Sequence, residues 1–379
     1  MNFTDSQGTN NEMIFTDEKN IQLIEFFESL GFSSFPVNGF KVINKYTSTE
    51  EEINSLYQGV VLRNISHQGI IELKGSDAMD LIHRIATNSL KDLPKEGVKN
   101  TVFTSDKGKL IGLVTLMNFE NYQLLVCDRA DKLKVMSWIR KYVINDDVEV
   151  NDANLKYNLL ELSGPQANSF STLICGNVVN EMAENSFKIV HSENILFFVI
   201  KLRGERGFNK FWFLADLENS RRLINYAMMN KGIFNFNLIG EEAYNIYRIE
   251  QGLPVAPYEL NDAYNPYEAG LDDYIDFNKG CYIGQEAILR MQNNDSSQKK
   301  LAGIKFSDPL ENHNGQIVLE DNGLKVGTVT SYAVSHKLNT PIGLAYIKNS
   351  HLKPYTQLSL RLSDDKVVKS EVHLLPFIK

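Results

Sequence analysis

Hydrophobic residues near the N-terminus recur every three positions, which is close to one turn of a helix. The positions concerned are Ile21, Ile24, Phe27 and Leu30, and Gly31 follows the last of them. Such spacing is typical of an amphipathic helix that packs on a core, and a glycine commonly ends a helix of this kind. We therefore predict one helix in this segment.

A second helix is predicted from Ser48 to about Gly59. Ser48 is followed three residues later by Glu51. A serine and a glutamate at this spacing form a capping box, in which each side chain can bond the backbone N–H of the other residue. The serine therefore marks the start of the helix, and the glycine marks its end.

One sequence unit occurs twice in the middle of the chain. Residues 72–78 read ELKGSDA and residues 161–167 read ELSGPQA. The two segments align at a constant offset of 89 residues. In both copies a strand-like run, a glycine turn and a helix-like run follow in the same order. A solenoid needs several short repeats, so a single pair indicates a duplicated α+β unit. Chance similarity is the alternative.

The second half of the chain is rich in strand signals. Residues 195–215 hold two β-rich runs joined by a polar, glycine-bearing segment, a pattern that predicts a hairpin. After residue 298, short apolar runs alternate with Asn-Gly-type turns, as in a small β-barrel. We expect an N-terminal extension at 1–34, a region of two interleaved modules at 35–297 and a C-terminal β-barrel at 298–379.

Composition narrows the class of protein. Of 379 residues, 43% are hydrophobic and 23% are charged, which is typical of a globular protein with two or three domains. No apolar run reaches the ~18 residues of a membrane span, and the N-terminus lacks a signal-peptide pattern, so we expect no membrane partner. A net charge of −8 disfavours direct binding to nucleic acid, which requires clustered basic residues.

The three cysteines are odd in number and far apart. No pair has metal-ligand spacing, so we expect no metal site, no disulfide framework and a reducing, cytoplasmic location. Cys127 and Cys175 follow apolar runs and are expected in the core. Cys281 lies instead in NKGCYIGQEAILR, among glycines and polar residues. It is either a small buried residue or a reactive, ligand-facing thiol whose thiolate Lys279 would favour at close range.

Two further segments hold candidate ligand contacts. In RGERGFN, Glu205 lies between Gly204 and Gly207. The segment is either a hairpin turn with solvated charges or a site where Glu205 accepts paired N–H bonds from a flat heterocycle such as a pterin. In YNIYRIEQGLPV, Arg248 lies either on a helix surface beside Glu250 or in a pocket for an anionic ligand tail.

Taken together, these segments resemble the folate-binding proteins related to the glycine-cleavage T-protein. ISHQGIIELKGSDA is similar to the family's DVSHMG-plus-strand segment, LRGERGF to its TGExGF turn and RIEQGLPV to its RxExGxP segment. GTVTSYAVS, PIGLAYI and LPF resemble its C-terminal barrel. These segments follow in the family's order over more than 300 residues.

Two departures indicate a subfamily. T-proteins carry a catalytic Asp pair in a GGxxDD pattern, and Gly112 and Leu113 stand at those positions here. The second departure is a match to the YgfZ-type signature K-G-C-[FY]-x-G-Q-E-x-x-x-[RK]. The residues that fit it are Lys279, Gly280, Cys281, Tyr282, Gly284, Gln285, Glu286 and Arg290.

The resemblance implies an α+β ring of three modules around a folate channel, with a pseudo-duplicated α/β folate-binding portion and a small C-terminal β-barrel. It implies tetrahydrofolate or a folate derivative as cofactor, with Glu205 recognising the pterin, and iron–sulfur client or assembly proteins as partners. The other folate contacts that it suggests are Arg248, Tyr282 and Gln285, and the reactive candidates are Cys281 and Lys279.

The function that the resemblance implies is therefore that of a folate-binding accessory protein for iron–sulfur cluster assembly or repair. The alternative is an aminomethyltransferase of the glycine cleavage system or another folate-dependent one-carbon transferase. Whether the chain is an enzyme stays open, because Gly112 and Leu113 replace the Asp pair.

Overall fold

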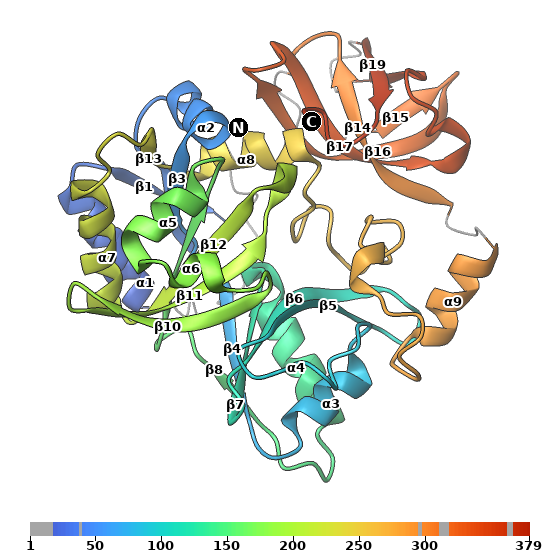
Figure 1. Ribbon diagram of the computed structural model, residues 1–379. Coiled ribbons are helices and arrows are strands. Elements are labelled where there is room, and N and C mark those ends of the chain that lie inside the picture. Colours follow the sequence, from blue (N-terminus) through green and yellow to red (C-terminus); the bar gives the residue numbers. More distant parts are fainter. Residues whose placement is uncertain (1–17, 38–39, 295–297, 311–317, 362–366) are drawn as a thin grey trace.

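Three modules make up the part of the chain that the structure describes, a computed structural model covering residues 18–37, 40–294, 298–310, 318–361 and 367–379. Figure 1 shows two sheet-and-helix modules and a barrel arranged around a common centre. The predicted α+β fold with a C-terminal β-barrel is confirmed. Within the described residues, no helix is long and apolar enough to cross a membrane.

The first module is built on a six-stranded sheet. Its strand order is β10 (Ser186–Ser192), β11 (Ile195–Arg203), β12 (Asn209–Ala215), β9 (Asn158–Ser163), β3 (Val60–Asn64) and β13 (Phe236–Leu238). The pair β13–β3 is parallel, and the other four neighbouring pairs of this sheet are antiparallel. The accompanying elements are α1 (Glu18–Ser29), the hairpin of β1 (Ser33–Val37) and β2 (Phe40–Lys45), α2 (Thr49–Gln58), α5 (Ala167–Cys175), α6 (Val178–Glu181), α7 (Leu217–Met229) and α8 (Glu241–Gln251).

The two helices predicted near the N-terminus are present. Helix α1 ends at Ser29 and buries Ile24 and Phe27, whereas Leu30 lies beyond its end and is exposed. Helix α2 begins where predicted, because the Ser48 hydroxyl accepts a hydrogen bond from the Glu51 backbone N–H at 3.2 Å.

The second module lies between two strands of the first. The chain leaves β3, forms a five-stranded sheet and returns to the first module at β9. The sheet order is β5 (Val98–Thr104), β6 (Leu110–Asn118), β7 (Tyr122–Cys127), β4 (Gly69–Lys74) and β8 (Glu149–Asp152). Helices α3 (Ala78–Ile85) and α4 (Lys132–Tyr142) pack on this sheet, and a short 3-10 turn, η1 (Arg129–Asp131), precedes α4.

The repeated sequence unit is a repeated structural unit. Strand β4 is matched by β9, and the start of α3 is matched by the start of α5, both at the offset of 89 positions that the sequence predicts. The intervening glycines adopt nearly the same positive φ, 117° at Gly75 and 113° at Gly164, a conformation that glycine adopts without strain. The two copies belong to different sheets.

The third module is a closed barrel. Its strand order is β14 (Lys299–Phe306), β17 (Thr340–Lys348), β16 (Leu324–Ser335), β15 (Val318–Asp321), β18 (Gln357–Arg361) and β19 (Val367–His373). Closure pairs the edge strands, which removes open sheet edges. Helix α9 (Gln285–Asn294) precedes it, and three short 3-10 turns complete the elements: η2 (Glu205–Gly207), η3 (Asp272–Tyr274) and η4 (Asn349–His351).

A buried polar network joins helix α8 to the barrel. Arg248 donates to the Glu259 carboxylate at 3.2 Å and to the Ser331 hydroxyl at 2.8 Å, and Ser331 donates to Glu259 at 2.6 Å. Two residues further along α8, Glu250 accepts hydrogen bonds of 2.6 Å from both Tyr57 and Ser335. Because Glu250 and Glu259 are both 0% exposed, these contacts provide the polar partners that buried carboxylates require.

We predict that Arg248→Met destabilises the protein by about 3–5 kcal/mol, because it leaves the Glu259 carboxylate buried without its cation. Urea unfolding followed by circular dichroism measures the change. Arg222→Met is the matched control, since Arg222 is 53% exposed and pairs with Glu218 on a helix surface, where ion pairs contribute little. Equal stability of the two variants would contradict the prediction.

Candidate functional site

The glycines around Glu205 are explained by the turn between β11 and β12. The Gly204 N–H donates to the Phe208 carbonyl at 2.9 Å, and a Cβ at Gly204 would lie only 2.7 Å from that oxygen. Arg206 and Gly207 both have positive φ, 60° and 77°. The turn therefore requires glycine for its own geometry, and it places the Glu205 side chain beside β12.

Glu205 lies within a cluster of buried and half-buried charges. The Lys210 ammonium is 3.2 Å from the Glu205 carboxylate and 3.8 Å from that of Glu161, which also accepts from the Trp212 indole N–H at 3.0 Å. Burial opposes the charge on Lys210, yet the two carboxylates raise its pKa well above the usual range. Lys210 is therefore a permanent cation between two acids.

Arg63 continues this cluster. Its guanidinium donates to both carboxylate oxygens of Glu241, at 3.0 and 2.8 Å, and lies 3.3 Å above the Tyr244 ring. It is also 3.9 Å from Glu161. The fork-like pairing is the strong form of an arginine–carboxylate contact. We call Arg63, Glu161, Glu205, Lys210 and Glu241 the charged cluster; it has three carboxylates and two cations.

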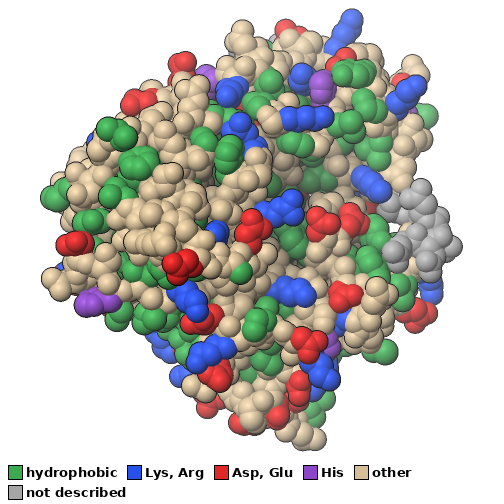
Figure 2. All heavy atoms as spheres, viewed as in Figure 1, with side chains coloured by type: hydrophobic (Ala, Val, Ile, Leu, Met, Phe, Trp, Pro, Cys, Tyr) green, Lys and Arg blue, Asp and Glu red, His purple; other side chains and the backbone are tan. Residues whose placement is uncertain are grey.

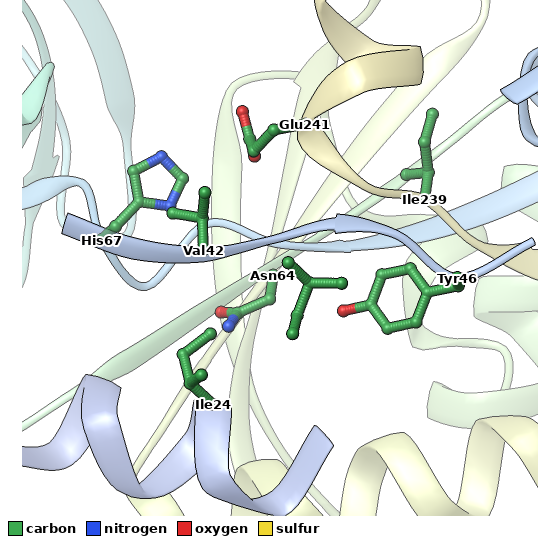
Figure 3. A pocket seen from close by; sticks show the side chains of 8 residues that line it. Ile24, Val42, Tyr46, Asn64, His67, Ile239 and Glu241 are labelled. Atoms are coloured by element: carbon green, nitrogen blue, oxygen red, sulfur yellow. The ribbon is translucent and has the colours of Figure 1, made fainter. Parts of the chain in front are cut away.

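Two hollows adjoin the charged cluster, and Figure 2 shows acidic and basic side chains around the centre of this face of the molecule. The first hollow is lined by Ile24, Val42, Ile43, Tyr46, Asn64, His67, Ile239 and Glu241, and Figure 3 shows all of these except Ile43 by label around strand β2. The second is lined by Leu56, Ser163, Gly164, Gly204, Glu205, Arg206, Phe208, Asn209, Lys210 and Tyr247.

His67 holds a neutral imidazole in the first hollow. Burial lowers its pKa to about 4, and the nearby Arg63 and Arg129 act in the same direction against the opposing effect of Glu241. A neutral imidazole can both donate and accept a hydrogen bond. The sequence motif placed His67 in the family pattern. It did not predict that burial and nearby arginines would keep the imidazole neutral.

The two positions expected to carry the Asp pair hold no acid, and the first of them has little room for one. A Cβ at Gly112 would lie 2.6 Å from the Val135 Cγ2 methyl on helix α4. Leu113 packs with an apolar cluster that includes Tyr264. The nearest substitute is Asp131, whose Oδ2 lies 3.7 Å from the site of that Cβ.

Asp128 and Asp131 are carboxylates that sequence reasoning missed. Both belong to the segment that follows β7, and the Asp128 carboxylate accepts from the Ala130 N–H at 3.1 Å. Burial is the main cause that raises the pKa of Asp128, to about 6, and the neighbouring Asp131 adds to it. The available signal was a D-x-x-D spacing directly after an apolar run.

Arg248 is not among the residues that line the two hollows. Its guanidinium is 5% exposed and bonds Asn245, Leu253, Glu259 and Ser331. The structure therefore places it at the junction of α8 and the barrel. A contact of Arg248 with folate stays a prediction.

The loop of Cys281 is fastened at one end by Lys279. The Lys279 ammonium donates to the backbone carbonyls of His83, Ala86 and Asn88, at 2.5, 2.6 and 3.0 Å. These carbonyls end helix α3, where a cation is favoured. Burial lowers the pKa of Lys279 to about 8. All three ammonium protons are thus directed at helix α3.

The other end of the loop is held by the β5–β6 hairpin. Thr104 donates to the Ile283 carbonyl at 2.7 Å, and Gly284, at φ +84°, leaves no space for a Cβ because Ser105 O would be 2.3 Å away. Between these ends Cys281 is exposed, unlike the buried Cys127 and Cys175.

Tyr282 and Gln285 complete this loop. Tyr282 is 7% exposed, and within the described part of the chain its hydroxyl has no hydrogen-bond partner. Gln285 is the first residue of α9. Lys279, Cys281, Tyr282 and Gln285 thus belong to one short segment of the chain, whereas Glu205 lies in the charged cluster of the first module. Among the described residues, no group of three or more His, Cys, Asp or Glu could hold a metal ion.

We predict that Lys279→Met loosens the Cys281 loop, because three backbone carbonyls at the end of α3 lose their donor. Amide hydrogen exchange of residues 279–284 should become about tenfold faster or more. Lys107→Met is the control, since Lys107 is exposed at the tip of the hairpin that holds the other end of the loop. Unchanged exchange in the Lys279 variant would refute the anchoring role.

His67 should make the protein less stable in acid. Between pH 6.5 and 4 the unfolded chain binds a proton at His67 that the folded chain excludes, so stability falls as pH falls, by about 2 kcal/mol. His67→Asn should remove this part of the pH dependence in urea-unfolding curves at pH 7.5 and 4.5. The exposed His191 provides the control variant, His191→Asn, which should keep the wild-type dependence.

Comparison with known proteins finds relatives over most of the chain. Residues 23–279 match the GCVT N-terminal domain, and residues 299–379 match the glycine cleavage T-protein C-terminal barrel domain. An aminomethyltransferase of Staphylococcus epidermidis is 27% identical over 364 residues, which are 93% of this chain and 98% of that protein. A chloroplastic protein of Arabidopsis thaliana, provisionally named a transferase, is 27% identical over 327 residues, 86% of this chain and 73% of that protein.

A solved structure shares the fold. The crystal structure of glycine cleavage system aminomethyltransferase T from Bartonella henselae matches with a TM-score of 0.82 and 20% identity. The match covers 94% of this chain and 97% of that one.

Proposed function

The chain belongs to the glycine cleavage T-protein family, and we propose that within this family it is a tetrahydrofolate-binding accessory protein of the YgfZ type. Its role is to support the assembly or repair of iron–sulfur clusters. Its partners are a folate derivative and iron–sulfur client or assembly proteins, and its location is the cytoplasm.

The observation that carries this proposal lies on strand β6. T-proteins resemble this chain but have an Asp pair where it has Gly112 and Leu113. At Gly112 the Val135 methyl already occupies the space that a side chain would need. General acid–base help contributes ~10²–10⁴ in rate, and these two positions have no group to supply it.

The charged cluster supports the folate part of the proposal. Glu205 is a half-buried carboxylate at the edge of a hollow, and a carboxylate accepts the paired N–H groups of a flat heterocycle well. The Cys281 loop supports the accessory part. Lys279 and Gly284 fix the ends of the loop while its thiol stays exposed, so that it is available to a sulfur or iron species.

The second candidate is an aminomethyltransferase of the glycine cleavage system, and the name of the Staphylococcus epidermidis relative favours it. Another folate-dependent one-carbon transferase is the variant of this candidate. Either activity would need a carboxylate from outside β6. Asp128 and Asp131 are candidates for this carboxylate. Asp131 lies near Gly112, and burial raises the pKa of Asp128 to about 6.

Folate binding is tested by titrating the protein with tetrahydrofolate. A ligand that binds only the folded state raises the melting temperature with concentration, and we expect this shift in the wild type and its loss in Glu205→Ala. Glu218→Ala, on an exposed helix surface, is the control and should keep the shift. No shift with any folate in the wild type would contradict the proposal.

The two candidate functions give opposite results in a second pair of assays. For the accessory role, Cys281→Ala in a strain that depends on this protein should lower the activity of an iron–sulfur client enzyme. Cys175→Ala is the control, because Cys175 is buried in the core. Release of ammonia from a loaded lipoyl carrier protein, with formation of methylene-tetrahydrofolate, would establish the transferase instead.

A further inference from the structure

We infer that Lys210 makes this site selective for heterocycles that carry a carbonyl oxygen next to their paired N–H donors. The ligand class is the 2-amino-4-oxopteridines, as distinct from their 4-amino analogues. This inference rests on the proposed folate-binding function and adds to it the residue that reads the oxygen at position 4.

The geometry is that of a carboxylate and an ammonium side by side. Glu205 and Lys210 are 3.2 Å apart, with side chains 19% and 17% exposed, and both line the second hollow. The pair therefore presents two acceptor oxygens next to a donor. A 2-amino-4-oxopteridine has the complementary edge, which is an amino N–H, a ring N–H and a carbonyl oxygen in a row.

A 4-amino analogue does not complement this pair. It has an amino group in place of the carbonyl and no hydrogen on the adjacent ring nitrogen, so that the Lys210 ammonium would face a second donor and Glu205 would lose one N–H donor. Lys210 itself has no acceptor to offer. A buried polar group left without a partner is the strongest source of discrimination in a binding site.

The charge on Lys210 is held by two acids, so that the ammonium remains when a ligand engages Glu205. Glu161, 3.8 Å away and 7% exposed, is the second acid, and its own position is fixed by Trp212. Lys210 bonds one oxygen of Glu205, Oε1. The Glu205 carboxylate therefore keeps acceptor capacity for the N–H groups of a ligand.

An independent feature of the same hollow also points to a ligand. Ser163 lines it and is 9% exposed, and among the described residues its hydroxyl oxygen has no hydrogen-bond partner. Buried hydroxyl groups in folded proteins are normally bonded. A polar ligand in the second hollow would supply the partner that Ser163 lacks.

The test uses two ligands that differ at position 4 of the pteridine, folic acid and its 4-amino analogue aminopterin. Calorimetry should show that the wild type binds folic acid about tenfold more tightly or better, as expected for a hydrogen bond to a charged group. In Lys210→Met this ratio should fall by about threefold or more, through loss of folic acid affinity, while the part that comes from the ring N–H remains. Lys210→Arg keeps the cation and should keep most of the ratio.

Two controls separate the possible outcomes. Lys188→Met removes a half-exposed lysine on β10 that pairs with Glu96. This variant should leave the affinity ratio unchanged. If Lys210→Met folds poorly, Lys210→Gln provides the neutral variant. A wild type that binds folic acid and tetrahydrofolate, with a ratio unaffected by these Lys210 variants, would overturn the inference and leave the folate function intact. A wild type that binds no pteridine would overturn both.

Discussion

The arrangement of the three modules depends on two carboxylates that have no contact with solvent. Glu250 and Glu259 are fully buried between helix α8 and the barrel, and a buried acid is tolerated only where its oxygens are bonded. Tyr57, Ser331 and Ser335 supply those bonds. Because they come from α2 in the first module and from β16 in the barrel, the network fixes the barrel in one position against the first module.

Stability does not explain the charged cluster in the way that it explains this network. Buried ion pairs add little to stability, because the cost of removing charges from water offsets their attraction. A cluster with more carboxylates than cations is weaker still as a stabilising device. Its position beside two hollows is instead what the proposed recognition of a ligand with several N–H donors requires. The fold thus has one set of buried charges that joins modules and a second set for which we propose a role in ligand binding.

Local features could be predicted from the sequence, and long-range ones could not. The Ser48 cap, the repeat unit and the barrel follow from spacing and turn residues that act within a few positions. The partners of Lys279 could not be foreseen, because they lie on a helix end nearly two hundred residues away in the chain. The same holds for the protein partners of Arg248, which belong to the barrel junction and lie more than eighty residues away in the case of Ser331.

The duplicated unit allows equivalent residues of its two copies to be compared within one molecule. Glu72 and Glu161 occupy the same position in the two copies, and both are almost completely buried. Glu72 pairs with Lys74 and Lys156, whose side chains are 48% and 47% exposed, whereas Glu161 lies between two largely buried cations of the charged cluster. The same position in the repeat thus bonds surface lysines in one copy and belongs to an interior cluster in the other. Comparison of the two glutamates separates what the strand–turn–helix unit does by itself from what the centre of the ring has added to it.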